Sequence, residues 1–362
     1  MSTPLGLAVI GTNWITSSFV QSCHESKLYK LVAVYSRKLE TAQKFISETP
    51  SIQDASSIKS YDDLDTMFSQ DSKIDVVYIA SPNSLHYEHG LKALNAGKHV
   101  IMEKPFASNM KELDALYKLA DSKDLFILEA YRHIQEPNFK TLQSLLDDDK
   151  TRTEKFGKIY GASLSMAIYS SRVSQITETN IPNVVSPKFS GGALWDMGCY
   201  VVTFALRLFG TPANQTYFPV IIGTVVDGGG PIILQYTPET SKHNQKFTVH
   251  AHTSKIYTST APTEIYCEKG TIKIEGGQPS NATDINTIEF IPRGSKESEQ
   301  LGDTNPEYSG MLNLTWEAKE LGRIIQEGDK TAEADLRALS RSVLTVMEDM
   351  RKQNDIVFDS ER

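Results

Sequence analysis

The 362-residue sequence contains only three cysteines, Cys23, Cys199 and Cys267, and they lie far apart. An odd number of widely spaced cysteines neither forms a disulfide framework nor has the paired spacing of a zinc site. A chain of this length buries enough apolar surface to fold without such cross-links. We therefore expect a protein of a reducing compartment, the cytoplasm, that holds no metal.

The sequence also lacks an excess of positive charge. It has 37 Lys and Arg residues against 45 Asp and Glu residues, a formal net charge of −8. Nucleic acids and anionic membranes are bound through a basic field or patch, so neither is an expected partner. The apolar run within the first eleven residues is too short for a secretion signal or a membrane span. The expected partner is a small-molecule substrate.

A length of 362 residues predicts two domains, at about 150 residues each. Up to residue 128, apolar runs of strand length alternate with segments of helical periodicity. The expected strands are Leu5–Ile10, Leu31–Tyr35, Ile74–Ala80, His99–Met102 and Leu125–Leu128, and the expected helices are Trp14–Ser26, Leu39–Glu48, His86–Ala96 and Met110–Ser122. This alternation predicts right-handed βαβ crossovers and a doubly wound parallel sheet, an α/β fold.

Residues 129–362 have a different pattern, with many strands in succession and few helices. The expected strands are Lys158–Tyr169, Pro219–Val226, Ile232–Thr237, Phe247–Thr253, Glu264–Glu268 and Thr271–Glu275, and the expected helices are Asp196–Phe209, Glu317–Gln326 and Ala334–Lys352. The glycine run Asp227–Pro231 is interpreted as a turn. This pattern predicts a second α/β domain with a large open, mostly antiparallel sheet.

The turn after the first expected strand suits a dinucleotide phosphate. Its residues are Gly11, Thr12, Asn13, Trp14 and Ile15. A dinucleotide fold has G-x-G-x-x-G here, but only Gly11 matches. Asn13, in the second position, is the non-glycine residue most tolerant of positive φ. The following helix N-terminus can still offer N–H groups to a diphosphate, although a lone glycine after a strand also fits an ordinary turn.

The second expected strand is followed by Ser36, Arg37 and Lys38. An NAD-preferring fold places Asp or Glu here against the ribose diol. A hydroxyl followed by two cations suits the 2′-phosphate of NADP(H) instead, and a solvated basic turn is the alternative. We expect NADP(H) to be favoured over NAD(H).

Two further groups of polar residues follow successive strands. Ser81, Pro82, Asn83 and His86 come after the third strand, and Glu103, Lys104 and Pro105 after the fourth. Ligands of open α/β sheets bind at the carboxyl ends of the strands, so these are candidate cofactor-binding residues. The alternatives are a helix cap at Asn83, a packed neutral His86 and a surface charge at Lys104.

With these motifs, the chain resembles the Gfo/Idh/MocA family of oxidoreductases, in the branches typified by glucose-fructose oxidoreductase and dimeric dihydrodiol dehydrogenase. The resemblance covers nearly the whole chain. Besides the segments above, it rests on Ala42 to Phe45, Glu129 to Arg132 with Pro137, Phe156 to Lys158, Gly191 to Tyr200 and Glu264 to Ile272.

The resemblance implies a Rossmann domain (1–128) followed by a substrate-binding and oligomerisation domain (129–362). It implies a homodimer or homotetramer formed through the C-terminal sheet. It also places Lys104 beside the nicotinamide and the reacting hydroxyl or carbonyl, and makes Tyr200 a second polar group. Tyr at this position is found in branches that favour NADP(H), in agreement with Ser36 and Arg37.

The expected reaction is hydride transfer between the nicotinamide and a carbon that carries a hydroxyl or carbonyl. Tyr200 is the expected proton donor or acceptor, because the nearby Lys104 ammonium would lower the pKa of its phenol from about 10. The two residues could also exchange roles. Asp196 is expected to bind a substrate hydroxyl or to cap the helix, and Arg132 to contact substrate or cofactor. The alternative function is a non-catalytic NAD(P)-sensing regulatory protein on the same fold.

Overall fold

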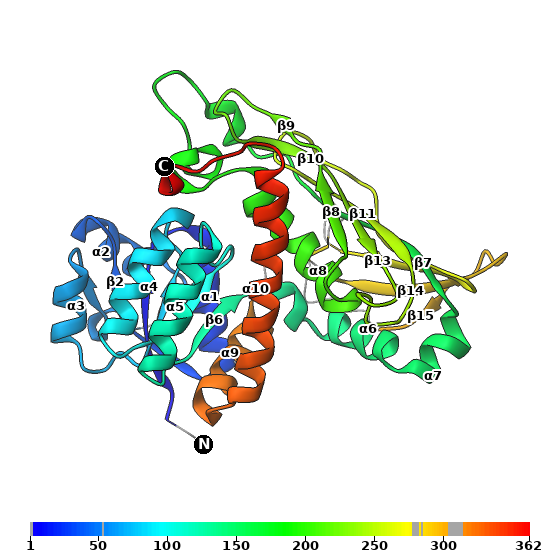
Figure 1. Cartoon of the computed structure of the whole chain (residues 1–362). Coiled ribbons are helices and arrows are strands. Elements are labelled where there is room, and N and C mark those ends of the chain that lie inside the picture. Colours follow the sequence, from blue (N-terminus) through cyan, green and yellow to red (C-terminus); the bar gives the residue numbers. More distant parts are fainter. Residues whose placement is uncertain (1–2, 53, 277–281, 284, 303–313) are drawn as a thin grey trace. The chain divides into compact units, whose positions relative to one another are not determined.

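The computed structural model describes residues 3–52, 54–276, 282–283, 285–302 and 314–362 (Figure 1). They form two compact units. The first contains the described residues up to Tyr131 and those from 314 to Ser340, and the second contains those from Arg132 to 302 and from Arg341 to Arg362. The predicted domain boundary at residue 128 places residues 314–340 in the second domain, whereas in the structure they belong to the first unit.

The first unit is built on a six-stranded parallel sheet, as predicted. Its strands are β1 (Leu5–Ile10), β2 (Tyr29–Tyr35), β3 (Lys59–Tyr61), β4 (Val76–Ile79), β5 (His99–Glu103) and β6 (Ile127–Ala130). Their order in the sheet is β3-β2-β1-β4-β5-β6, and every pair is parallel. This is the Rossmann order, in which the direction of winding reverses between β1 and β4.

Seven helices of the described residues contribute to this unit. They are α1 (Trp14–Ser26), α2 (Leu39–Glu48), α3 (Leu64–Gln70), α4 (His86–Asn95), α5 (Met110–Ser122), α9 (Thr315–Glu327) and the first part of α10 (Lys330–Lys352). Helices α1, α2 and α5 have the predicted bounds. Side chains cap α1 and α5, because Asn13 and Asn109 each accept a hydrogen bond from an N–H of the first turn. The β3–α3 segment was not predicted.

Helix α9 packs against α1, which explains why residues 314–340 belong to the first unit. The Leu314 N–H donates to Ser22 Oγ of α1 at 3.2 Å. Gly322 lies against Tyr29, so that a Cβ at this position would be only 2.9 Å from the tyrosine ring. A small residue on α9 therefore allows the close packing.

The second unit is built on a nine-stranded sheet. Its strands are β7 (Ile159–Ala167), β8 (Asn214–Tyr217), β9 (Val220–Ile221), β10 (Asp227–Tyr236), β11 (Phe247–Ser254), β12 (Thr263–Cys267), β13 (Gly270–Glu275), β14 (Thr287–Pro292) and β15 (Glu299–Gln300). The order is β15-β14-β13-β12-β7-β11-β10-β8, with β9 paired to β10. Only β7 and β11 pair in parallel, so the prediction of a mostly antiparallel sheet is confirmed. Strands β8, β14 and β15 were not predicted.

The interpretation of Asp227–Pro231 as a turn was wrong, because these residues begin β10. Gly229 and Gly230 have φ angles of 151° and 159°, and a Cβ on Gly230 would lie 2.1 Å from the carbonyl oxygen of Phe218. Glycine in a strand commonly marks such a close approach of another backbone. The strand expected over Pro219–Val226 is correspondingly reduced to β9.

The helix expected over Asp196–Phe209 has two parts. A π-helical turn, Leu194–Gly198, precedes α8 (Cys199–Phe209), which ends before Gly210 with φ 95° as its Gly-Thr-Pro sequence predicts. Pro187–Phe209 is apolar and long enough to cross a membrane, but 83% of the 18-residue window that qualifies it is buried inside the protein. A core helix has these properties, and α8 packs against β7 and β11.

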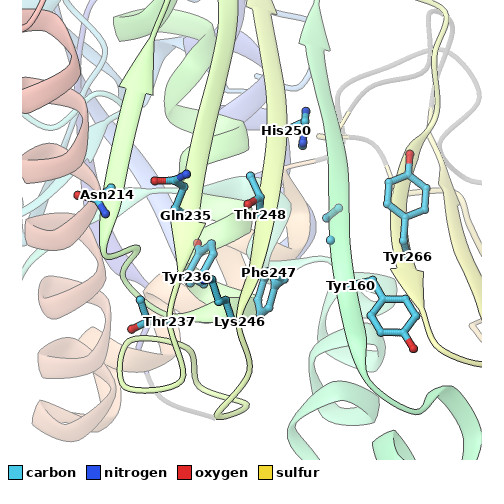
Figure 2. Close-up of a pocket in the computed structure, with 12 residues that line it drawn as sticks. Tyr160, Asn214, Gln235, Tyr236, Thr237, Lys246, Phe247, Thr248, His250 and Tyr266 are labelled. Carbon is cyan, nitrogen blue, oxygen red and sulfur yellow. The ribbon is translucent and has the colours of Figure 1, made fainter.

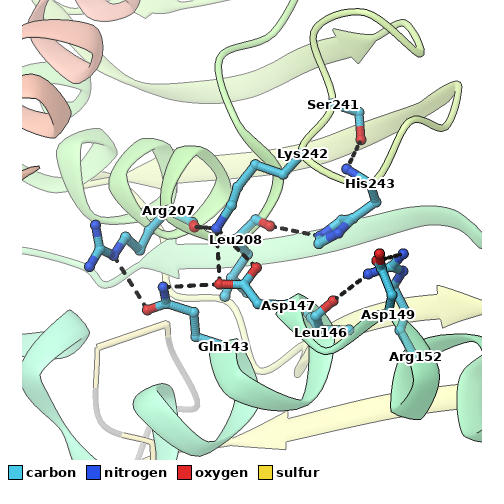
Figure 3. A network of polar contacts seen from close by, with 10 residues as sticks. All are labelled: Gln143, Leu146, Asp147, Asp149, Arg152, Arg207, Leu208, Ser241, Lys242 and His243. Carbon is cyan, nitrogen blue, oxygen red and sulfur yellow. Dashed lines mark hydrogen bonds and ion pairs between the residues drawn. The ribbon is translucent and has the colours of Figure 1, made fainter.

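A polar network connects α6 (Pro137–Asp147), α7 (Asp149–Thr151) and the end of α8 to the loop between β10 and β11 (Figure 3). Lys242 Nζ binds the Asp147 carboxylate at 2.9 Å and the Arg207 carbonyl at 3.3 Å. His243 Nε2 lies 2.9 Å from the Leu208 carbonyl oxygen. These contacts hold the C-terminal end of α8 in place. The π-helical turn precedes the N-terminal end of the same helix.

Candidate functional site

The first group of candidate residues lies where β1 and β4 end, at the point where the strand order reverses. The Ala80 N–H donates to the Ile10 carbonyl at 2.9 Å, and Gly11 follows with φ 109°. A Cβ on Gly11 would lie 2.6 Å from the Ala80 carbonyl oxygen. The one retained glycine of the motif is therefore required by the close approach of two strand ends.

Asn13 stands at a position where positive φ is tolerated, but it does not adopt a positive φ. Its φ is −88° and its ψ is 177°, and its side chain caps α1. Asn13 Oδ1 accepts from the Thr16 N–H at 3.0 Å, and Asn13 Nδ2 donates to the Ala80 carbonyl at 2.9 Å. The Asn13 side chain thus fixes the loop through hydrogen bonds, which a glycine at this position could not form.

This loop fits a diphosphate. The cap takes up the Thr16 N–H and leaves the N–H groups of Trp14 and Ile15 in the first turn of α1, where anions bind helices. Thr12 and Ile15 are partly exposed, and the Trp14 side chain is 65% exposed. After β2, Ser36 is half-buried and its N–H donates to the Tyr61 carbonyl, whereas Arg37 and Lys38 are exposed.

His86 connects the ends of β4 and β5. Its Nε2 lies 2.9 Å from the Ser81 carbonyl oxygen, and its Nδ1 lies 2.9 Å from the Pro105 carbonyl oxygen. The ring is 1% exposed, and burial lowers its pKa to about 4, so the imidazole is neutral at physiological pH and donates to one of the two carbonyls. His86 therefore connects the turn at Ser81 to the segment that carries Lys104. Pro82 and Asn83, in the turn between Ser81 and His86, are half-buried.

Lys104 lies in a segment that carboxyl groups hold on both sides. The Tyr78 hydroxyl of β4 donates to Glu103 Oε1 at 2.6 Å, and the Phe106 N–H donates to Glu129 Oε1 at 2.8 Å. Glu129 is buried, and desolvation raises its pKa to about 8. The lysine thus extends from the carboxyl end of β5 on a backbone with little freedom.

The second group of candidate residues surrounds the π-helical turn of the second unit. Asp227, the first residue of β10, accepts from the Leu194 N–H at 2.5 Å and from the Tyr217 hydroxyl at 2.7 Å. A Cβ on Gly192 would lie 2.3 Å from Asp227 Oδ1, which explains the glycine and its φ of 133°. Burial raises the pKa of Asp227. This carboxyl group anchors the turn that carries Asp196.

Asp196 pairs with a lysine that the sequence did not indicate. Asp196 Oδ2 contacts Nζ of Lys255, whose side chain is 4% exposed. Tyr200, four residues further on, is 9% exposed, and its ring meets the ring of His133 edge to face at 5.2 Å. Asp196 is therefore not the cap of α8, where Gly198 stands at the cap position without a side-chain cap. Tyr200 lies against a second titratable ring.

Arg132 is buried, with its Nη2 2.7 Å from Thr283 Oγ1 and its Nη1 3.4 Å from Glu136 Oε1. These contacts give it a structural role within the second unit. Contact with substrate or cofactor stays a prediction for this residue.

The structure thus brings the predicted cofactor residues together at one edge of the first unit, and Asp196 and Tyr200 together in the second. Lys104 and Tyr200 belong to different units, and their pairing stays a prediction. Sequence reasoning missed His133, Asp227 and Lys255. Nothing in their local sequence distinguishes them, since their partners lie 10 to 67 positions away.

A hollow of about 630 Å³ lies elsewhere in the second unit, on the outer face of the sheet (Figure 2). Residues of β7, β8, β10, β11 and β12 line it, among them Tyr160, Gln235, His250 and Tyr266. None of the candidate site residues does. In the part of the chain that the structure describes, no three His, Cys, Asp or Glu side chains are placed to hold a metal ion.

Comparison with known proteins identifies the family. The profile of Gfo/Idh/MocA, an oxidoreductase family with an NAD-binding Rossmann fold, matches residues 5–131. The oxidoreductase YgjR of Escherichia coli (strain K12) is 33% identical over 354 residues, which are 98% of this chain and 98% of YgjR. The chain belongs to the Gfo/Idh/MocA family of oxidoreductases. The first unit is accordingly an NAD(P)-binding Rossmann domain.

Two other relatives have named activities. The scyllo-inositol 2-dehydrogenase (NADP(+)) IolU of Bacillus subtilis is 33% identical over 355 residues, 98% of each chain. The trans-1,2-dihydrobenzene-1,2-diol dehydrogenase of Xenopus tropicalis is 26% identical over 336 residues, 91% of each chain. Among solved structures, the 3-ketoreductase KijD10 of Actinomadura kijaniata, in complex with NADP, shares the fold with a TM-score of 0.73 at 17% identity, over 96% of this chain and 97% of that one.

Proposed function

We propose that this protein is an NADP(H)-preferring dehydrogenase or reductase, which acts on a CH–OH or carbonyl carbon of a sugar, cyclic polyol or dihydrodiol. The observation that carries the proposal is the held position of Lys104 at the end of β5, in the same unit as the loop that fits a diphosphate. The activities named for IolU and for the dihydrodiol dehydrogenase support the substrate class.

The cofactor preference rests on the residues after β2. The exposed Arg37 can hold a 2′-phosphate bidentately. Positions 36–38 hold no Asp or Glu that could bind the ribose diol of NAD. IolU is named as an NADP(+)-dependent enzyme, and the structure of KijD10 is a complex with NADP. Both agree with this preference.

In the proposed mechanism the nicotinamide supplies or accepts the hydride when the cofactor is bound. Tyr200 gives a proton to the substrate oxygen in reduction and takes it in oxidation. The Lys104 ammonium polarises that oxygen and stabilises a phenolate by charge attraction. In a variant of this mechanism, the two residues exchange roles.

The test is NADPH oxidation by the purified protein with aldoses, ketoses, inosones and dicarbonyls, and the reverse reaction with inositols and dihydrodiols. Turnover of at least one class with NADPH is expected. NADPH binding without turnover of any of them would favour the alternative, a non-catalytic NAD(P)-sensing regulatory protein. Failure to bind either nucleotide would contradict both functions.

The proposed assembly is a homodimer or homotetramer formed through the C-terminal sheet. Its outer face carries Tyr160 and Tyr266, which are 55% and 38% exposed beside the hollow of Figure 2. Aromatic side chains are enriched at protein interfaces. Light scattering should show an oligomer that Tyr160→Asp with Tyr266→Asp dissociates, and a wild-type monomer would exclude this assembly. The cytoplasm is the proposed location, in keeping with three buried free cysteines.

A further inference from the structure

Lys255 is a buried lysine with a fixed backbone. It follows β11, its N–H donates to the Gly228 carbonyl at 2.8 Å, and its carbonyl accepts from the Ser170 N–H at 2.9 Å. The side chain is 4% exposed. The structure therefore brings an ammonium group into the interior of the second unit from a backbone that is held on both sides.

The only ion-pair or hydrogen-bond partner of this ammonium, among the residues that the structure describes, is Asp196. A buried ammonium is unfavourable unless an opposite charge pairs with it. Lys255 thus favours an ionised Asp196 carboxylate, and it fixes one of the two carboxylate oxygens.

The turn that carries Asp196 has backbone anchors other than Lys255. The Leu194 N–H is held by Asp227, and the Ala193 carbonyl accepts from Thr253 Oγ1 at 3.2 Å. What Lys255 adds is the charge and orientation of one carboxylate. A single turn of π-helix before an α-helix is a feature often found at functional sites.

The Asp196 side chain is also within reach of a ligand, because it is 23% exposed whereas its partner is 4% exposed. An ionised carboxylate has about four acceptor positions, of which the Lys255 ammonium takes one. A hydroxyl that donates to such a carboxylate forms a charge-assisted hydrogen bond, about twice as strong as a neutral one.

We propose that Lys255 is a positioning residue for substrate recognition, which keeps Asp196 ionised and oriented to accept a hydrogen bond from a substrate hydroxyl other than the reacting one. The inference rests on the proposed function and sharpens it. It assigns the preference for polyhydroxy substrates to the Asp196–Lys255 pair, separately from the chemistry of Lys104 and Tyr200.

The experiment compares two substrates on the same enzyme, a polyhydroxy substrate found in the panel above and its analogue that lacks one hydroxyl beside the reacting carbon. The variants are Lys255→Met, which retains the apolar stem, Asp196→Asn and the double variant, with Lys255→Arg as the charge-retaining control. The measured quantity is the ratio of kcat/KM for the two substrates. Partial loss of folded protein lowers both values equally and leaves this ratio unchanged.

We expect Lys255→Met to lower the ratio about tenfold or more, through a higher KM for the polyhydroxy substrate, while the affinity for NADPH is retained. Asp196→Asn should lower it similarly, and the double variant should be no worse than Asp196→Asn, because Lys255 acts through Asp196. Lys255→Arg should retain most of the discrimination. A ratio that Lys255→Met or Asp196→Asn leaves at the wild-type value would overturn the proposal, as would additive effects in the double variant.

Failure of the proposed function is distinguishable from failure of this inference. If the wild type binds NADPH but turns over no substrate, calorimetry with the same polyols replaces the kinetic ratio. Binding that Lys255→Met weakens would support the Asp196–Lys255 pair without a catalytic role for the protein. Absence of any polyol binding by the wild type would exclude the pair as a recognition site.

Discussion

The two units hold their candidate residues by different means. In the first, the Asn13 amide fixes the loop after β1, and the neutral His86 ring connects Ser81 to Pro105. The carboxyl groups of Glu103 and Glu129 hold the segment around Lys104 through single hydrogen bonds from a hydroxyl and an N–H. In the second, buried carboxylates anchor the π-helical turn and its Asp196, through Asp227 and through the pair with Lys255. Removing one partner of a buried charge pair is strongly destabilising, whereas losing a neutral contact costs less. The second unit should therefore be the more sensitive to single substitutions.

The largest effect is expected for the proposed proton pair, which takes Lys104 from the first unit and Tyr200 from the second. Lys104→Ala and Tyr200→Phe should each lower turnover about 100- to 10,000-fold, because each removes a group that moves or stabilises the transferred proton. The affinity for NADPH, measured by fluorescence titration, should change less than threefold. Retained activity in both variants would rule out the proposed proton pair.

The next effect tests the Asp227 anchor of the second unit. Asp227→Ala leaves the buried Leu194 N–H and Tyr217 hydroxyl without their acceptor. We expect a loss of about 3 kcal/mol in the free energy of unfolding, measured with urea. Asp227→Asn, which retains an acceptor oxygen, is the matched control and should lose less. A loss below about 1 kcal/mol in Asp227→Ala would show that the turn is held by other contacts.

The neutral anchor of the first unit predicts a dependence on pH. Burial lowers the pKa of His86 to about 4, below its value of about 6.5 in the unfolded chain. The unfolded state therefore binds more protons between these values. The contribution of His86 to stability is complete above pH 6.5 and is lost as the pH falls toward 4, by about 1.4 kcal/mol per pH unit. His86→Asn should reduce the slope of unfolding free energy against pH by that amount, and parallel curves would contradict a neutral His86.

A smaller effect concerns selectivity for the cofactor. The wild type should bind NADPH about ten times or more tightly than NADH, and Arg37→Ala should abolish the difference by weakening NADPH alone. Lys38→Ala is the matched control, since Lys38 is exposed on the same turn. Equal affinities in the intact protein would refute the role assigned to Ser36 and Arg37.

The smallest effect is expected at Asn13. Asn13→Ala removes the cap of α1 and should cost about 1 kcal/mol of stability, with weaker binding of NADPH because the loop loses its fixed shape. Asn13→Asp keeps the cap but brings a negative charge to the diphosphate, so it should weaken nucleotide binding without the loss of stability. Unchanged NADPH affinity in both variants would separate this loop from the cofactor.

The sequence predicted the first unit better than the second, for a physical reason. The bounds of α1 and α5 depend on local signals, namely apolar periodicity and the caps Asn13 and Asn109. The start of β10 depends instead on the approach of Phe218 to Gly230, which no local pattern indicates. The candidate site shows the same division. Lys104 could be predicted as a candidate because it directly follows a strand. Lys255 could not, because only its contact with Asp196, 59 positions away, marks it as part of the candidate site.

The packing of α9 on α1 has a practical consequence for work on isolated pieces of this protein. A fragment that ends near residue 131, where the family profile stops, would expose the surface of α1 and Tyr29 that Gly322 and Leu314 cover. Such a truncated Rossmann domain should aggregate or require detergent. Joining residues 314–340 to it through a short linker should yield a well-behaved nucleotide-binding module for crystallisation or NMR.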